Sequence, residues 1–340
     1  MAPFPSGIIE RQTLRQVIKV TSLDSLKKNL RGISLPFTSP FTPEGALDTS
    51  ALIRNLEKWS TTGITGLVAL GSTGERVHLD QNEYLAVIET ARAAVPSNLS
   101  LIVGAGQQST IGTVKEVKAA ASSGADAVLV ITPSFYRSAI TQDVLVDYYT
   151  VVADASPVPV MLYSMPALTG ITIEPESIAR LSEHSNIIGV KDSSNNMDGF
   201  SETVRLCPTD FAVMTGNGTV LLDALKLGAS GGILAVGCAV PEVCVDVFHV
   251  FKSGAVARAE ALQTKLTPFA AAVTTRFGIG GLKKALELAG YHGGTVRAPL
   301  RMPSEDQCEE IARLYNDVVT MTKISKSGKP GNYSTSHQSA

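Results

Sequence analysis

Short apolar segments alternate with longer amphipathic segments between residues 32 and 253 of the chain. The apolar segments are four or five residues long and rich in Val, Ile, Leu and Gly, which is typical of strands buried on both faces of a parallel sheet. The strands predicted in this way are Gly32–Leu35, Gly66–Leu70, Leu101–Gly104, Ala127–Ile131, Val160–Tyr163, Ile187–Lys191, Ala212–Thr215 and Gly231–Leu234.

The amphipathic segments predict a helix after each strand. Asp80 and Ser109 stand at N-cap positions, and Pro175 and Pro241 fit a first helical turn, where a missing N–H costs nothing. The predicted helices are Thr49–Thr62, Gln81–Ala94, Thr110–Ser123, Gln142–Ala155, Pro175–Glu183, Asp198–Leu206, Thr219–Leu227 and Pro241–Lys252, followed by a loop and helix within Arg276–Gly290 and a last helix over Glu305–Lys323.

Eight β/α units within about 220 residues predict an α/β fold, a closed (β/α)8 TIM barrel over residues 32–253. A doubly wound open sheet is the alternative, but it would carry a glycine-rich dinucleotide loop after its first strand, and Gly32-Ile-Ser-Leu-Pro-Phe-Thr38 has none. Residues 254–323 are expected to add a C-terminal helical extension.

The two ends of the chain differ from its middle. Residues 1–31 carry six basic side chains interleaved with apolar ones and only two acidic ones. This N-terminal extension suits either a mitochondrial targeting segment or an ordinary helix packed on the barrel, so the expected compartment is the cytoplasm or the mitochondrial matrix. Residues 324–340 are polar and rich in Ser and Gly, and we expect a disordered tail there.

Composition excludes several classes of partner. The 340-residue chain has a formal net charge of −2, so nucleic acid is not an expected partner. It has no apolar stretch of the about 20 residues that cross a bilayer, so a membrane is not expected either. The four cysteines form no CxxC pair and the five histidines no ligand pair, and we expect neither a metal nor a cofactor.

Barrels of this kind keep their chemistry at the carboxyl ends of the strands. Lys191 ends the apolar run Asn186-Ile-Ile-Gly-Val-Lys191. A lysine in this place is either a surface charge at the rim or an amine in a dry pocket. In the second case desolvation disfavours the ammonium form and gives a nucleophile able to form a Schiff base.

Other strand ends carry polar groups as well. The loop Gly71-Ser-Thr-Gly-Glu75 offers hydroxyls and amides that could hold a carboxylate or phosphate, although a plain turn would use the same residues. Tyr136 and Tyr163 could relay protons or simply pack at the rim. Cys238 is interpreted as a small apolar core residue, because no histidine motif accompanies it.

The set Gly71-Ser-Thr-Gly-Glu75, Tyr163-Ser-Met-Pro166 and Gly189-Val-Lys191 resembles the dihydrodipicolinate synthase and N-acetylneuraminate lyase superfamily over residues 32–320. Its members are class I aldolases on a (β/α)8 barrel with a C-terminal helical extension. Within it, the segments Ala272–Lys284 and Gly290–Leu300, with Lys191-Asp-Ser193, most resemble mitochondrial 4-hydroxy-2-oxoglutarate aldolase.

The resemblance implies a role for each matching residue. Lys191 would form the Schiff base with a 2-oxo acid, and Tyr163 would shuttle the proton of the substrate hydroxyl. Tyr136 would complete the relay, lent across a contact between two subunits. The substrate-binding residues would be Ser72, Thr73, Gly74, Ser193 and Ile233, the last through its carbonyl. The family also implies a homotetramer or a homodimer.

Two departures from the family pattern leave the substrate open. Leu168 stands where dihydrodipicolinate synthases carry an arginine for the carboxylate of the aldehyde substrate, which makes that condensation an unfavoured alternative. Leucine here resembles sialic acid lyases and some sugar-acid aldolases. Thr73 stands where 4-hydroxy-2-oxoglutarate aldolases have asparagine. The candidates are therefore 4-hydroxy-2-oxoglutarate, cleaved to pyruvate and glyoxylate, and a 2-keto-3-deoxy sugar acid.

Two hypotheses lie outside this class. Gly216-Asn-Gly218 and Gly231-Gly232 could build the phosphate site of a sugar-phosphate isomerase or epimerase. Alternatively, the barrel could bind a 2-oxo acid without turning it over, although Lys191 and Tyr163 both being present argues against this.

Overall fold

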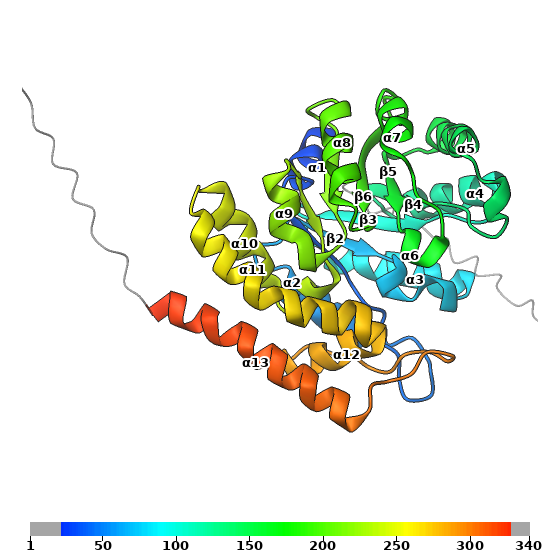
Figure 1. The fold of residues 1–340 in the computed structure, drawn as a ribbon. Coiled ribbons are helices and arrows are strands. Elements are labelled where there is room, and N and C mark those ends of the chain that lie inside the picture. The colour runs from blue at the N-terminus through cyan, green and yellow to red at the C-terminus, as the bar shows by residue number, and fades with distance from the viewer. Residues whose placement is uncertain (1–21, 328–340) are drawn as a thin grey trace, which may run out of the picture.

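The computed structural model describes residues 22–327, and within them it forms a closed barrel of eight parallel strands in sequence order (Figure 1). The TIM barrel predicted from the alternating pattern is therefore confirmed. The strands are β1 (Ile33–Pro36), β2 (Gly66–Ala69), β3 (Ser100–Ala105), β4 (Ala127–Ile131), β5 (Val160–Ser164), β6 (Ile187–Asp192), β7 (Ala212–Thr215) and β8 (Gly231–Ile233).

Helices follow the strands around the outside of the barrel, as the amphipathic pattern predicts. They are α2 (Thr49–Trp59), α3 (Gln81–Ala94), α4 (Thr110–Ser122), α5 (Gln142–Ala155), α6 (Pro166–Thr169), α7 (Pro175–Ser182), α8 (Met197–Leu206), α9 (Leu221–Lys226) and α10 (Pro241–Lys252). The helix predicted from Thr219 begins as a 3-10 turn over Gly218–Val220. There the Asn217 side chain accepts a hydrogen bond from the Thr219 amide, at 2.9 Å, and sets a tighter first turn.

Two apolar layers hold the barrel together. The larger one lies between the strands and the surrounding helices, and includes Trp59, whose indole N–H donates to the carbonyl of Cys238 at 2.8 Å. The smaller one fills the inside of the barrel, so the barrel is a packed core and not a pore. Its buried members are Leu26, Leu30, Val68, Ile102, Ala127, Leu129, Met161, Tyr163, Ile188, Ala212, Met214 and Ile233.

The short helix α1 (Leu23–Asn29) closes the amino end of the barrel. Leu26 and the following Leu30 belong to the interior layer, and each is only 1% exposed. Around them, Lys27 pairs with Asp210 at 2.7 Å, just before β7, and Asn29 donates to the carbonyl of Asn98 at 3.0 Å, just before β3. Within the described part of the N-terminal extension, the packed helix is thus the correct interpretation. A targeting segment would fall on residues 1–21, outside the described residues.

The C-terminal region forms a helical layer on one side of the barrel. It contains α11 (Val256–Ala271), a π-helical turn over Ala272–Arg276, α12 (Gly278–Leu288) and α13 (Glu305–Ser327). The long helix α13, red in Figure 1, packs along both α11 and α12. It runs to Ser327 and so takes in the first four residues of the expected tail, and residues 328–340 lie outside the described part.

Candidate active site

Lys191 and Tyr163 lie side by side at the carboxyl end of the barrel. They are register partners on β6 and β5, so both side chains project toward the barrel interior from neighbouring strands. Lys191 is 4% exposed and Tyr163 3%. The Lys191 ammonium nitrogen lies 4.3 Å from the centre of the Tyr163 ring. Lys191 is therefore a buried side chain and not a surface charge at the rim, and its role as a nucleophile stays a prediction.

The surroundings of Lys191 suit a nucleophile better than an ion pair. Among the described residues, no carboxylate lies within ion-pair distance of its Nζ, and the nitrogen instead lies over the Tyr163 ring. Gly216, after β7, makes room for the side chain. A Cβ built on Gly216 would lie 2.8 Å from Lys191 Cε and 1.8 Å from Ser193 Oγ, both closer than real contacts allow.

The loop after β2 delivers a hydroxyl to the tyrosine. Ser72 begins a 3-10 turn over Ser72–Gly74, and its Oγ lies 2.9 Å from the phenolic oxygen of Tyr163. Ser39 also stabilises this turn, because its hydroxyl donates to the Gly74 carbonyl at 2.8 Å. A hydroxyl pair of this kind can pass a proton in either direction, because each group both donates and accepts.

Two neighbouring cavities open at this end of the barrel. One, of about 330 Å³, is lined by Lys191, Tyr163, Ser72, Thr73 and Ser193, and we call it the lysine cavity. The other, of about 410 Å³, extends past the loop after β2 toward Arg76 and His78, and we call it the distal cavity. They share a wall. Its residues are Ser72, Tyr163, Leu168, Ile279 and Leu300.

The C-terminal helical layer supplies much of the lysine cavity. The π-helical turn contributes Thr274 and Thr275, and π-turns inside helices frequently accompany functional sites. None of these wall residues was predicted as part of the site, because they follow the barrel in sequence and have no local motif. The wall residues from this layer are Val273, Thr274, Thr275, Gly278, Ile279, Leu282 and Leu300.

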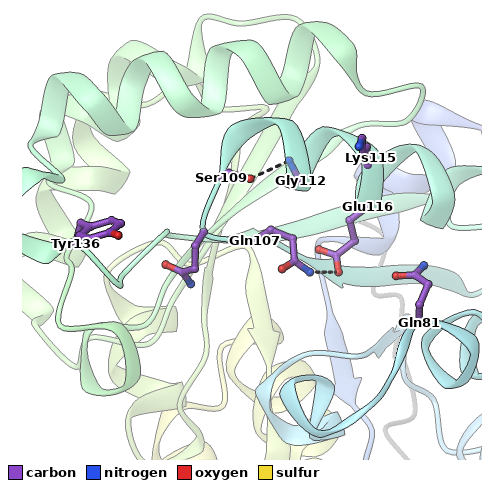
Figure 2. Close-up of a pocket in the computed structure, with 8 residues that line it drawn as sticks. Gln81, Gln107, Ser109, Gly112, Lys115, Glu116 and Tyr136 are labelled. Carbon is purple, nitrogen blue, oxygen red and sulfur yellow. Dashed lines mark hydrogen bonds between the residues drawn. The ribbon is translucent and has the colours of Figure 1, made fainter.

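Three predicted residues lie away from the lysine cavity within a single chain. Ile233 is fully buried inside the barrel and Gly74 is buried behind its turn, and neither lines the cavity. Tyr136 is 72% exposed and faces a separate open recess with Gln107, Ser109 and Glu116 (Figure 2). Its predicted role requires a second subunit and stays a prediction.

Two groups near the site, the half-buried Asp192 and the buried Cys238, have raised pKa values. Burial raises the pKa of the Asp192 carboxyl, which accepts a hydrogen bond from the Ser194 amide at 2.7 Å. Burial also raises the pKa of the Cys238 thiol, and its sulfur lies 3.3 Å from the Pro36 carbonyl. A buried thiol of raised pKa is a poor nucleophile, so the interpretation of Cys238 as a core residue fits its surroundings.

The fold and this site define a class of protein: a parallel barrel enzyme with an unpaired, buried lysine at its carboxyl end. Comparison with known proteins identifies the family. Residues 29–317 match the dihydrodipicolinate synthetase family, and the chain belongs to it. It is a class I pyruvate-dependent aldolase or lyase, as the enzymes of this family are.

The chain matches several curated relatives over nearly their whole length. The chain is 34% identical over 291 residues to a 4-hydroxy-tetrahydrodipicolinate synthase of Methanothrix thermoacetophila, covering 85% of this chain and 96% of the relative. It is 29% identical over 297 residues to a protein of Emericella nidulans described as a mitochondrial 4-hydroxy-2-oxoglutarate aldolase, covering 86% and 96%. The expected special closeness to 4-hydroxy-2-oxoglutarate aldolase is thus not supported, because several synthases are at least as similar.

Solved structures agree with the barrel throughout. A monomeric dihydrodipicolinate synthase variant superposes with a TM-score of 0.83 at 28% identity, covering 87% of this chain and 99% of that one. A prophage protein of the same family from E. coli K12, solved in complex with pyruvate, superposes with a TM-score of 0.79 at 29% identity, covering 85% of this chain and 98% of that one.

Among the described residues, no helix combines the length and apolarity that a membrane crossing requires.

Proposed function

We propose that this chain cleaves a 4-hydroxy-2-oxo acid to pyruvate and an aldehyde, or joins the two, through a Schiff base on Lys191. The single observation that carries the proposal is the buried, unpaired Lys191 beside Tyr163, whose hydroxyl contacts Ser72. The pyruvate found in the related prophage protein supports the same half of the substrate.

The proposed mechanism runs through these groups in sequence. The Lys191 amine adds to the C2 carbonyl of the substrate, and loss of water leaves an iminium. Tyr163 takes the proton of the 4-hydroxyl as it passes its own proton through the Ser72 hydroxyl to solvent, and the C3–C4 bond breaks with its electron pair moving toward the iminium. The aldehyde leaves, and the enamine accepts a proton at C3. Water then hydrolyses the imine, releasing pyruvate and the free amine. Ser72 and Thr73 would hold the carboxylate next to C2.

Two substrate candidates remain from the sequence, and different observations support each. The fungal relative described as a 4-hydroxy-2-oxoglutarate aldolase supports that substrate and a mitochondrial location. Leu168 on the shared wall supports a 2-keto-3-deoxy sugar acid. The relatives that carry synthase names support condensation as the direction of reaction, although Leu168 offers no cation for their aldehyde.

The other hypotheses find less support in the site. Asn217, in the suggested phosphate loop, has its own side-chain oxygen bound by the Thr219 amide and hydroxyl, both at 2.9 Å. That leaves the loop folded on itself. A homodimer or homotetramer would be needed to bring Tyr136 of one subunit toward the relay of another, and we keep that assembly as part of the proposal.

The test is borohydride trapping. After incubation with pyruvate and sodium borohydride, peptide mass spectrometry should find a reduced pyruvyl adduct on Lys191 alone. K191A should give no adduct and lose aldehyde release by at least about 10³-fold while keeping its circular dichroism spectrum. Wild-type turnover in K191A, or an adduct elsewhere in folded protein, would overturn the proposal.

A further inference from the structure

Among the described residues, the basic side chains that line the aldehyde side of the site are already engaged. Besides Lys191, those that line the two cavities are Arg76 and His78. Arg76 pairs with both oxygens of Glu116 and donates to the Gly106 carbonyl at 2.9 Å. His78 Nδ1 lies 3.3 Å from Oε2 of Glu75. Each of these two basic side chains therefore already has a carboxylate partner.

The wall between the cavities is also largely apolar. Leu168, Ile279 and Leu300 face both cavities, and Leu282 adds to the lysine cavity. A carboxylate that loses water against such a wall needs a cation or several hydrogen-bond donors in exchange, or its burial disfavours binding. In the proposed mechanism the donors of the loop after β2, Ser72 and Thr73, already serve the carboxylate next to C2. Lys191 cannot serve, because in the proposed mechanism its nitrogen is part of the iminium.

We infer that the aldehyde half of the substrate is uncharged, so that the substrate carries one carboxylate only, the one next to its 2-oxo group. This rests on the proposed function. The inference favours one of the two candidate substrates. Cleavage of 4-hydroxy-2-oxoglutarate gives glyoxylate, which would place a second carboxylate against the wall. A 2-keto-3-deoxy sugar acid with a neutral tail gives an aldehyde without a carboxylate. Hydroxyls on that aldehyde would have Ser193, Thr274 and Thr275 as neighbours.

One exposed arginine is the alternative source of charge. The Arg137 guanidinium lies over Gly170, with Nη1 2.8 Å from the position of a Cβ on that glycine. Gly170 directly follows α6, which carries Leu168, but Arg137 lines neither cavity. If Arg137 swung inward to meet a carboxylate, reactions with charged aldehydes would depend on it.

The experiment measures condensation of pyruvate with matched aldehyde pairs by the full-length chain. Glycolaldehyde is compared with glyoxylate, and pentanal with succinic semialdehyde, at saturating pyruvate. We expect kcat/KM to be at least tenfold higher for a neutral aldehyde than for its charged counterpart. L168R should raise kcat/KM for the charged aldehydes at least tenfold, whereas L168M, which keeps size and neutrality, should keep the wild-type preference. R137A should leave all rates unchanged.

The outcomes separate the inference from the proposed function. If borohydride with pyruvate labels Lys191 but charged aldehydes react as well as neutral ones, the aldolase stands and the inference fails. If R137A selectively loses the charged aldehydes, Arg137 supplies the missing cation and the inference also fails. If no adduct forms on Lys191, the proposed function fails and takes the inference with it.

Discussion

At the scale of single residues, the site depends on hydroxyls whose contacts are short and buried. Tyr163 is held between the Lys191 ammonium over its ring, 4.3 Å from its centre, and the Ser72 hydroxyl at its oxygen, 2.9 Å away. The ring of Tyr163 therefore contacts the Lys191 ammonium, while its oxygen stays available for proton transfer with the substrate. This separation predicts that removing the oxygen will affect proton transfer without removing the nucleophile.

Y163F tests that separation. We expect cleavage of a 4-hydroxy-2-oxo acid to slow by roughly 10²–10⁴-fold, the range typical for loss of a positioned acid–base group. Borohydride trapping of pyruvate on Lys191 should persist, because the amine and its burial are unchanged. S72A should slow cleavage less, since the phenol remains. Stopped turnover together with lost trapping in folded Y163F would contradict this division of roles.

Residue patterns predicted the charged and hydroxylic side of the site but not its apolar side. Lys191, Tyr163, Ser72 and Thr73 each sit at or just after a strand, so the rule that barrels act at strand ends finds them. Ile279 and Leu300 look like any apolar residues of helices and loops. Only the docking of the C-terminal layer onto the barrel mouth, a contact between distant segments, places them in the cavity.

At the scale of elements, a buried ion pair joins the C-terminal helical layer to the loop after β2. Glu75, which follows the Ser72–Gly74 turn in a left-handed conformation with φ of 54°, pairs with Lys283 of α12 at 2.7 Å. Both side chains are 0% exposed. Lys283 also donates to the Ser39 carbonyl at 2.8 Å and to the Thr295 carbonyl. The same lysine thus ties α12 to two segments beside the turn.

Breaking this pair on one side should be costly. K283M leaves the Glu75 carboxylate buried without its cation, and we expect the free energy of unfolding to fall by about 3–5 kcal/mol. E75Q/K283M removes both charges and should recover part of that loss. Urea unfolding of the single and double variants measures the coupling. Because Glu75 supports the turn that bears Ser72 and Thr73, E75Q should also raise the KM for pyruvate.

Additive effects of the two substitutions on the free energy of unfolding would contradict this coupling. If the losses in E75Q and K283M simply add in the double variant, the two groups are not coupled, and the loop is held by other contacts such as that of Ser39 with Gly74. The burial of Lys283 could not be predicted from the sequence, because nothing local distinguishes a fully buried lysine in an amphipathic helix from an exposed one.

At the scale of the whole molecule, the two ends of the barrel differ in their contents. The carboxyl end carries Lys191 and both cavities, while the amino end is closed by α1 through Leu26 and Leu30. The alternating pattern predicted the barrel because each strand is buried on both faces. It did not place α1, because a seven-residue helix has too few positions for a period to show.

This separation predicts that the closing helix matters for stability and little for chemistry. L26A removes a side chain that is 1% exposed from the interior layer, and we expect a loss of about 2–5 kcal/mol in the free energy of unfolding, measured with urea. L23A, on the same helix at a residue 46% exposed, is the matched control and should change stability little. Trapping of pyruvate on Lys191 should proceed at the wild-type rate in both folded variants. The contradicting result would be a loss of trapping in L26A at urea concentrations below those that unfold it. It would mean that the position of α1 affects Lys191 through the interior layer, by way of Ile188 on β6, the strand of Lys191, and Tyr163 on β5.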